Sequence, residues 1–448
     1  MLSPTGMLGY GYNKKSFQEG LKRNPHSIAV DAGSTDAGPH KLGGGLGITS
    51  RAANKMDLTP LIKASKDKNI PVIIGSAGGT GDNERVDWTL DIVKEIAKEN
   101  NYKLKIVIIR ANIDKEYVKE RLRKKEVLPL GEAVPELTAE NIDNCRAIVA
   151  QMGIEPFIEA LKEEPDVIIG GRSYDPSMTA SICIKNGFDR ALSIHMGKIL
   201  ECGAQCAVPG SGGDCMMGYL RKDHFVLEPL NPIRRCTAVS TAAHTLYEKG
   251  HPYILYLPGG ELHLDRCKFE EIDNKKVKVS GSKYLPGEKY YLKLEGARMI
   301  GYRSFCLSGV RDPILIRELD NALEFTRNSV KEYFSEIPTD EYSIYFRVYG
   351  RNGVMGDLEP LKNNIPHEVG LVIDVVADTQ EKASYILAFT RSTLLHCHYE
   401  GRMTTAGNIA FPFAPSDVSA GPVYKFVVYH LIEEKDPIRL FPIELIEI

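Results

Sequence analysis

PVIIGSAGGTGDNE, at residues 71–84, is the stretch that decides the fold, because an apolar run leads directly into a glycine-rich turn and a helix pattern. The run is almost continuously apolar and β-branched, which is typical of a strand buried on both faces. Further runs of this kind lie at 27–33, 105–112 and 165–173. Amphipathic patterns between the runs predict helices at 58–68, 84–99, 115–125, 139–162 and 177–185. The alternation predicts an α/β fold with a doubly wound, mostly parallel sheet.

The later part of the chain follows a different pattern. Residues 191–275 are less regular, whereas strand patterns dominate from residue 276 onward and a helix is predicted at 380–397. We therefore predict an α/β domain at 1–190, a cysteine-containing segment at 191–275 that packs on it, and a mixed α+β domain at 276–448. A chain of 448 residues is expected to divide in this way, because single hydrophobic cores rarely grow beyond about 250–300 residues.

The composition argues against several classes of protein. A net charge of −3 does not suit a general nucleic-acid binder, and no run of apolar residues is long enough to predict a membrane span. The N-terminal residues lack the pattern of a secretory signal. Nine cysteines without the spacing of a small disulfide-rich domain indicate a reducing compartment. We expect a cytoplasmic enzyme that binds neither nucleic acid nor membrane.

Polar residues follow the predicted strands, at the edge of the sheet where doubly wound folds bind their ligands. Ser34 and Asp36 come after the first strand, and Arg172 comes directly after the last one of the α/β region. A guanidinium group at a strand end suits bidentate binding of a substrate carboxylate. The alternative is a structural ion pair between Arg172 and Asp175.

The turn after the strand at 71–79 is predicted to bind an anion. The residues concerned are Ser76, Gly78, Gly79 and Thr80. Their backbone N–H groups lie at the start of a helix, where the helix dipole attracts negative charge. The turn lacks the lysine of a P-loop, so a tight strand–helix turn capped by residue 82 or 83 is the alternative.

Four cysteines lie close together in the irregular segment, at Cys202, Cys206, Cys215 and Cys236. Thiolates are soft metal ligands, and three of them could hold a [4Fe–4S] cluster whose remaining iron acts as a Lewis acid. We predict Cys202, Cys215 and Cys236 as the ligands, with Cys206 as a substitute. The spacing matches no standard zinc or ferredoxin pattern, and buried packing thiols are the alternative.

Several separated blocks resemble the acyclic terpene utilisation (AtuA-like) family. They are LSPTGMLGYG, AVDAGSTDAGP, GSAGGTGDN, IIGGRSYDPS, HMGKILECGA, AAHTLYE, SGVRDP and GRMTTAGNIAFPFAPSD. The chain is most similar to a branch encoded near the genes for glutamate fermentation through methylaspartate and mesaconate. This resemblance implies a hydro-lyase for small dicarboxylic acids, often with a short companion subunit, and the additional cysteines imply dependence on a metal.

We therefore predict a hydro-lyase that acts on a branched hydroxy-dicarboxylate of the citramalate and mesaconate type, in a homo-oligomer. The iron of the cluster would polarise the leaving hydroxyl group, and Ser34, Asp36 or His244 would move the proton. Carboxylate binding is expected from Arg172, supported by Arg303, Arg311 and Arg402. Two alternatives remain open: a metal-free terpenoid or acyl-CoA-processing enzyme, and a non-catalytic scaffold subunit of a two-component complex.

Overall fold

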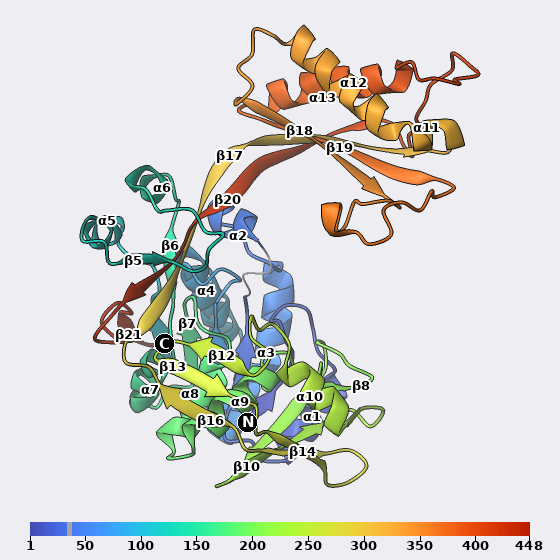
Figure 1. Cartoon of the computed structure of the whole chain (residues 1–448). Coiled ribbons are helices and arrows are strands. Elements are labelled where there is room, and N and C mark those ends of the chain that lie inside the picture. The colour runs from blue at the N-terminus through green and yellow to red at the C-terminus, as the bar shows by residue number, and fades with distance from the viewer. Residues whose placement is uncertain (34–37) are drawn as a thin grey trace. The chain divides into compact units, whose positions relative to one another are not determined.

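The computed structural model describes residues 1–33 and 38–448, which form two compact units. Unit 1 comprises Met1–Arg298 and Phe426–Ile448, and unit 2 comprises Met299–Lys425. The chain passes from unit 1 to unit 2 within strand β17 (Tyr291–Val310) and returns within strand β20 (Asp417–Glu433) (Figure 1). The boundaries of the two units therefore differ from those of the three parts that we predicted.

A large mixed sheet forms the centre of unit 1. Its parallel strands have the order β1-β2-β3-β7-β4, with bounds Leu2–Ser3, Ile28–Asp31, Val72–Gly75, Val167–Gly170 and Lys105–Ile109. Antiparallel strands extend it on the β1 side through β9 (Met216–Leu220), β10 (His224–Pro229), β15 (Val277–Ser280) and β14 (Lys268–Glu271). On the other side β21 (Ile443–Glu447) pairs with β4. The predicted fold class is confirmed, and the four apolar runs are β2, β3, β4 and β7.

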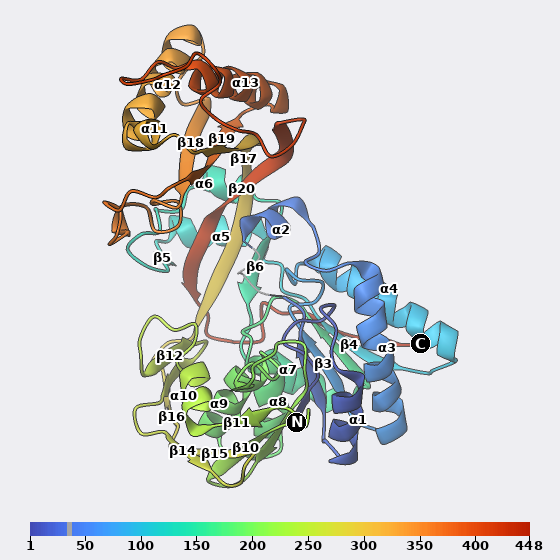
Figure 2. The ribbon, with the colours of Figure 1, turned by 90° about the vertical axis from the view of Figure 1, so that its right-hand side faces the viewer.

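Helices cover both faces of this sheet because successive side chains of a strand point to opposite faces. Val72 and Ile74 of β3 pack in one core with α1 (Lys14–Lys22), α3 (Arg51–Lys68) and α4 (Asn83–Asn100). Ile73 of the same strand packs in a second core with α7 (Glu155–Ala160), α8 (Ser177–Lys185) and α9 (Arg190–Leu200). Figure 2 shows the two groups of helices on opposite sides of β3.

One predicted helix is wrong. The single helix expected at 139–162 is replaced by α6 (Ala139–Asp143), strand β6 (Ile148–Gln151) and α7, followed by one short 3₁₀ turn (Leu161–Glu163). Strand β6 pairs with Lys293–Gly296 of β17, far along the chain. The local pattern favoured a helix, but pairing with a distant strand decided the conformation.

Unit 1 also contains shorter elements. Its remaining helices are α2 (Pro39–Gly44), α5 (Lys115–Arg123) and α10 (Ala238–Thr245). Strand β8 (Ala207–Val208) pairs with β11 (Arg235–Cys236), and β5 (Val127–Pro129) pairs with β20. A small antiparallel sheet consists of β12 (Ile254–Leu257), β13 (Gly260–His263) and β16 (Lys283–Pro286). Strands β12 and β13 form one wall of the pocket discussed below.

Unit 2 is an antiparallel sheet covered by helices on one face. Strand β19 (Val369–Ala377) pairs with β17 on one side and with β18 (Tyr342–Tyr349) on the other. A hydrophobic core joins this sheet to α11 (Pro313–Arg317), α12 (Leu319–Tyr333) and α13 (Gln380–His396), and a short 3₁₀ turn (Gly356–Leu358) follows β18. The predicted α+β character of the C-terminal region is confirmed. No helix among the residues described is both long and apolar enough to cross a membrane.

Candidate functional site

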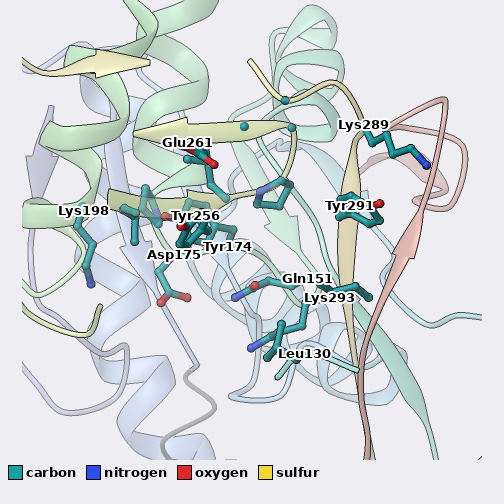
Figure 3. Close-up of a pocket in the computed structure, with 18 of the residues that line it drawn as sticks. Leu130, Gln151, Tyr174, Asp175, Lys198, Tyr256, Glu261, Lys289, Tyr291 and Lys293 are labelled. Atoms are coloured by element: carbon teal, nitrogen blue, oxygen red, sulfur yellow. The ribbon is translucent and has the colours of Figure 1, made fainter. Parts of the chain in front are cut away.

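Unit 1 contains a pocket of about 850 Å³ beside the carboxyl ends of β6 and β7 (Figure 3). Its polar side chains come from the connection after β7, the end of α9 and the first residues of β17. Its apolar side chains come mainly from β12 and the turn that leads into β13. All residues that line it belong to unit 1. The pocket lies at a strand end, where a doubly wound sheet is expected to bind its ligand.

A buried cluster of charges lies at the polar end of the pocket. Arg172 Nε donates to Glu295 Oε2 at 3.0 Å, and each of these side chains is only 3% exposed. Lys293 Nζ lies 2.6 Å from Glu295 Oε1. Burial acts to raise the pKa of Glu295, but the two cations outweigh it and hold this pKa below its usual value. Two cations thus share one carboxylate at this point of the pocket.

Two carboxyl groups beside this cluster have an unused oxygen atom. Asp175 Oδ1 and Glu201 Oε2 are buried, and neither has a hydrogen-bond partner within the described part of the chain. Arg172 Nη1 lies 3.6 Å from Asp175 Oδ1, which is too far for a hydrogen bond. The hydroxyl group of Tyr174 is also buried without a partner there. Since unpaired buried polar atoms are costly, these three groups are well placed to bind a polar ligand.

The close-up view shows how these groups are arranged. In Figure 3 the Asp175 carboxylate lies between Lys198 on one side and Gln151 and Lys293 on the other. Lys198 Nζ is also paired with Glu201 Oε1 and lies 3.3 Å from Glu248 Oε2. Positive and negative groups therefore alternate across the polar end of the pocket.

The two carboxyl groups have different charged neighbours. Burial raises the pKa of Glu201 to about 8, with Lys198 opposing this shift and Asp175 adding to it. Burial also raises the pKa of Asp175, but Arg172, Lys198 and Lys293 favour its ionised form. Glu201 is therefore protonated near neutral pH and can donate a proton. Paired carboxyl groups in different environments are the usual means of dividing acid and base roles.

Part of the pocket wall is apolar. The apolar lining residues are Leu130, Leu255, Leu257, Pro258 and Leu431, and the rings of Tyr256 and Tyr291 line the pocket as well. Glu261, Glu288 and Lys289 add charged groups to the wall. The whole pocket thus has room for a ligand that carries both anionic and apolar groups.

The glycine-rich turn that we predicted to bind an anion does not line this pocket. The N–H groups of Ser76 and Ala77 donate to carbonyl groups after β7, and that of Gly79 donates within the turn. The side chain of Asp82 caps α4, as the alternative interpretation predicted. Gly78 and Thr80 of the same turn are also buried. Ser76 acts on the pocket indirectly, because its hydroxyl oxygen accepts a hydrogen bond from Arg172 Nη1 at 3.1 Å.

The end of β2 adds another buried carboxyl group. Asp31 is 5% exposed, and burial raises its pKa well above the usual value, with Asp175 adding to the shift and Arg172 opposing it. Ser34 and Asp36, which we predicted to move the proton, lie outside the described residues. Their assignment therefore stays a prediction.

The cysteines are not gathered at one point. Cys206 Sγ and Cys236 Sγ lie 3.9 Å apart, because β8 and β11 are paired. Cys215 packs in the core on the other face of the main sheet, and Cys202 lines a second pocket. Within residues 1–33 and 38–448, no three His, Cys, Asp or Glu side chains are grouped so as to hold a metal ion. In this arrangement Cys202, Cys215 and Cys236 do not fit a [4Fe–4S] cluster. The binding of such a cluster by this protein stays a prediction.

His244 does not line the charged pocket. It lines the second pocket, of about 540 Å³, together with Cys202. Burial lowers the pKa of His244 to about 4, and Lys198 contributes to the shift. Its imidazole is therefore neutral at physiological pH, and the structure does not bring it together with Asp175 in one pocket.

The three further arginines that we predicted to bind carboxylates belong to unit 2. Arg303 Nε donates to Asp374 Oδ1 at 2.9 Å. Arg402 donates to the backbone carbonyl groups of residues 396, 397 and 406, which fixes the loop after α13. Arg311 lines a pocket of about 540 Å³ in unit 2. Only Arg172 of the four predicted arginines lines the charged pocket of unit 1.

A comparison with known proteins identifies the family. The model of the acyclic terpene utilisation family protein AtuA matches residues 49–217 and 230–419, most of the chain. The chain belongs to this family. No curated protein matches the chain, and no solved structure does. The predicted membership in the AtuA family is confirmed, whereas the branch encoded near methylaspartate genes stays a prediction.

Sequence reasoning missed several polar residues of this AtuA family member. Lys198 and Glu201 lie in the HMGKILECGA block, which we quoted only for its resemblance. Lys293 and Glu295 stand two positions apart in the strand pattern YYLKLEG, so they point to the same face. Opposite charges at this spacing inside an apolar strand could have predicted a buried ion pair, because buried charges are rare unless they are paired.

Proposed function

We propose that this member of the AtuA family is a hydro-lyase that adds water to, or removes it from, a small branched hydroxy-dicarboxylate of the citramalate and mesaconate type. One observation carries the proposal. Two cations, Arg172 and Lys293, share the single carboxylate of Glu295, while Asp175 and Glu201 beside them each keep an unpaired oxygen atom. Such a site offers a charge for the substrate carboxylate and two groups for proton transfer.

The substrate carboxylate binds at the cluster of cations. The ammonium group of Lys293 lines the pocket, and the amide of Gln151 lies beside it (Figure 3). Arg172 is held by Glu295 and Ser76, so its guanidinium contributes a fixed field rather than a mobile contact. A charge fixed in this way stabilises the negative charge that develops when a proton leaves the carbon next to a carboxylate.

Proton transfer then falls to two carboxyl groups. Asp175 takes the proton from the carbon, and the pair of electrons forms the double bond. Glu201, protonated near neutral pH, gives its proton to the leaving hydroxyl group, which departs as water. The proton on Asp175 afterwards returns to Glu201 through solvent, and hydration follows the same steps in reverse.

We assign no step to an iron–sulfur cluster, because the predicted thiols do not fit one in this arrangement. The nine cysteines are free thiols, which agrees with a reducing compartment and with the proposed cytoplasmic location. A homo-oligomeric state also belongs to this proposal, and so does a short companion subunit that is not required for turnover by the full chain.

A second candidate function is favoured by the apolar part of the pocket wall. A small dicarboxylate fills only part of about 850 Å³, whereas an acyl-CoA or a terpenoid acid would also occupy the wall formed by Leu130, Leu255 and Leu257. The two candidates predict different stabilising ligands. Citramalate and mesaconate raise the thermal unfolding midpoint in the first case, and acyl-CoA or long-chain acids do so in the second.

The deciding experiment follows the ultraviolet absorbance of the conjugated alkene with citramalate or mesaconate as substrate. We expect turnover by the full chain and a loss of at least about 100-fold in Glu201→Gln, which removes the proton donor. Glu270→Gln, on the exposed strand β14, is the matched control and should retain activity. The protein is assayed as purified and after anaerobic reconstitution with iron and sulfide. Folded protein without turnover in both preparations would refute the proposal.

A further inference from the structure

The second pocket of unit 1 differs from the first because no charged side chain is among the described residues that line it. Its volume is about 540 Å³, enough for a molecule of one or two rings. Aromatic rings, an amide and an imidazole line it, from Tyr10, Gln205, His244 and Tyr247. Lys198 Nζ lies 5.2 Å from the centroid of the Tyr247 ring, but it is already paired with Glu201 and Glu248. An ionised ligand would therefore lose its hydration without gaining an unpaired countercharge, so the lining favours an uncharged ligand.

His244 provides the polar contact of this pocket. The residue is only 7% exposed, and its Nε2 atom is buried without a hydrogen-bond partner in the described part of the chain. A neutral imidazole carries one donor and one acceptor nitrogen, so a ligand with an amide or similar group can satisfy Nε2 in either tautomer. Leaving such an atom unpaired is unfavourable, so a hydrogen bond from a ligand to Nε2 would stabilise binding.

The aromatic side chains favour a flat ligand. The rings of His244 and Tyr247 are stacked, with centroids 5.4 Å apart and planes 14° from parallel. Tyr247 is 45% exposed and Tyr10 is 68% exposed, so each can present part of its ring to a ligand. Aromatic rings bind other flat rings by offset stacking or edge-to-face contact.

We propose that this pocket binds a flat, uncharged ring whose hydrogen-bonding group pairs with His244 Nε2. The ligand differs in charge from the anionic substrate of the first pocket, so this inference does not depend on the proposed function. The two sites adjoin each other, since Glu201 lines the first pocket and the next residue, Cys202, lines the second.

The test uses benzamide and benzoate, which share a ring and differ in charge. Titration of the full chain, followed by calorimetry or ligand-observed NMR, should detect binding of benzamide. The affinity for benzoate should be at least about tenfold lower. His244→Phe keeps an aromatic ring but removes Nε2, and it should weaken benzamide by about tenfold. Lys293→Met, in the charged pocket, is the matched control and should leave benzamide binding unchanged.

A second readout does not depend on variants. Cys202 is partly exposed in this pocket, so bound benzamide should slow its alkylation, followed by mass spectrometry of the peptide. Alkylation of Cys267, which is also partly exposed but lies outside the pocket, should keep its rate. Absence of benzamide binding to the folded protein, equal affinity for benzoate, or loss of benzamide binding in Lys293→Met would each overturn the proposal.

Discussion

Each unit contains an ion cluster in which two cations share one carboxylate, but the cations of the two clusters differ in burial. In unit 1, Arg172 and Lys293 share Glu295, with the cations 3% and 15% exposed. In unit 2, Arg303 and Arg347 share Asp374, with side chains 38% and 47% exposed. Water can solvate the surplus charge of the second cluster but not that of the first. Burial rather than composition therefore distinguishes a binding site from a structural ion pair.

The largest expected effect comes from breaking the buried cluster. Glu295→Gln leaves Arg172 and Lys293 without their carboxylate and should lower the free energy of unfolding by about 3–5 kcal/mol. Urea unfolding followed by the fluorescence of Trp88, the single tryptophan, reports on unit 1, because this side chain packs in its core. Glu270→Gln, whose exposed ion pair with Lys278 is expected to contribute little, is the control. If Glu295→Gln lowers the free energy of unfolding by less than about 1 kcal/mol, the buried cluster contributes no more to stability than an exposed ion pair does.

The dependence of the stability of unit 1 on pH should be an effect of intermediate size. The pKa of Glu201 is about 8 in the folded protein and 4.5 in a solvated chain, so the folded state binds the extra proton between these values. The stability that this proton contributes is complete below pH 4.5 and is lost as the pH rises toward 8. Between pH 5 and 8 the loss should be about 3 kcal/mol, because each pH unit between the two pKa values changes the free energy of unfolding by about 1.4 kcal/mol.

Trp88 fluorescence during urea unfolding at several pH values measures this dependence. In Glu201→Gln the amide cannot ionise, so the decline should become shallower than in the parent protein. Equal slopes for the two proteins would mean that Glu201 titrates normally, and its role as proton donor would lose its basis.

The exposed cluster should give the smallest effect. Asp374→Asn leaves Arg303 and Arg347 accessible to water, so the free energy of unfolding should fall by only about 1 kcal/mol. Far-UV circular dichroism measures this change, since the only tryptophan lies in unit 1. A loss as large as that of Glu295→Gln would contradict the difference in burial that separates the clusters.

Sequence patterns could predict the features that depend only on neighbouring residues in the chain. The apolar runs of β2, β3, β4 and β7 and the position of Arg172 after β7 follow from local periodicity. The partners of Arg172 do not, because Glu295 and Lys293 reach the pocket only through the pairing of β17 with β6. The same pairing overturned the helix predicted at 139–162. Local patterns carry no information about such distant strand pairs.

The cysteines show how the same limit applies to residues that are close together in the chain. Closeness along the chain suggested closeness in space, but Cys215 and Cys236 pack on different faces of the main sheet. Short connections between elements can place neighbouring residues in separate cores, since successive strands and helices alternate between faces.

The insertion of unit 2 between β17 and β20 has a consequence for synthesis on the ribosome. Strand β21, which covers the edge of the main sheet at β4, emerges only after all of unit 2 has been made. Until then β4 presents free backbone groups that could pair with another nascent chain. We therefore expect truncated products that end between residues 432 and 442 to aggregate, even though they contain every side chain of the charged pocket.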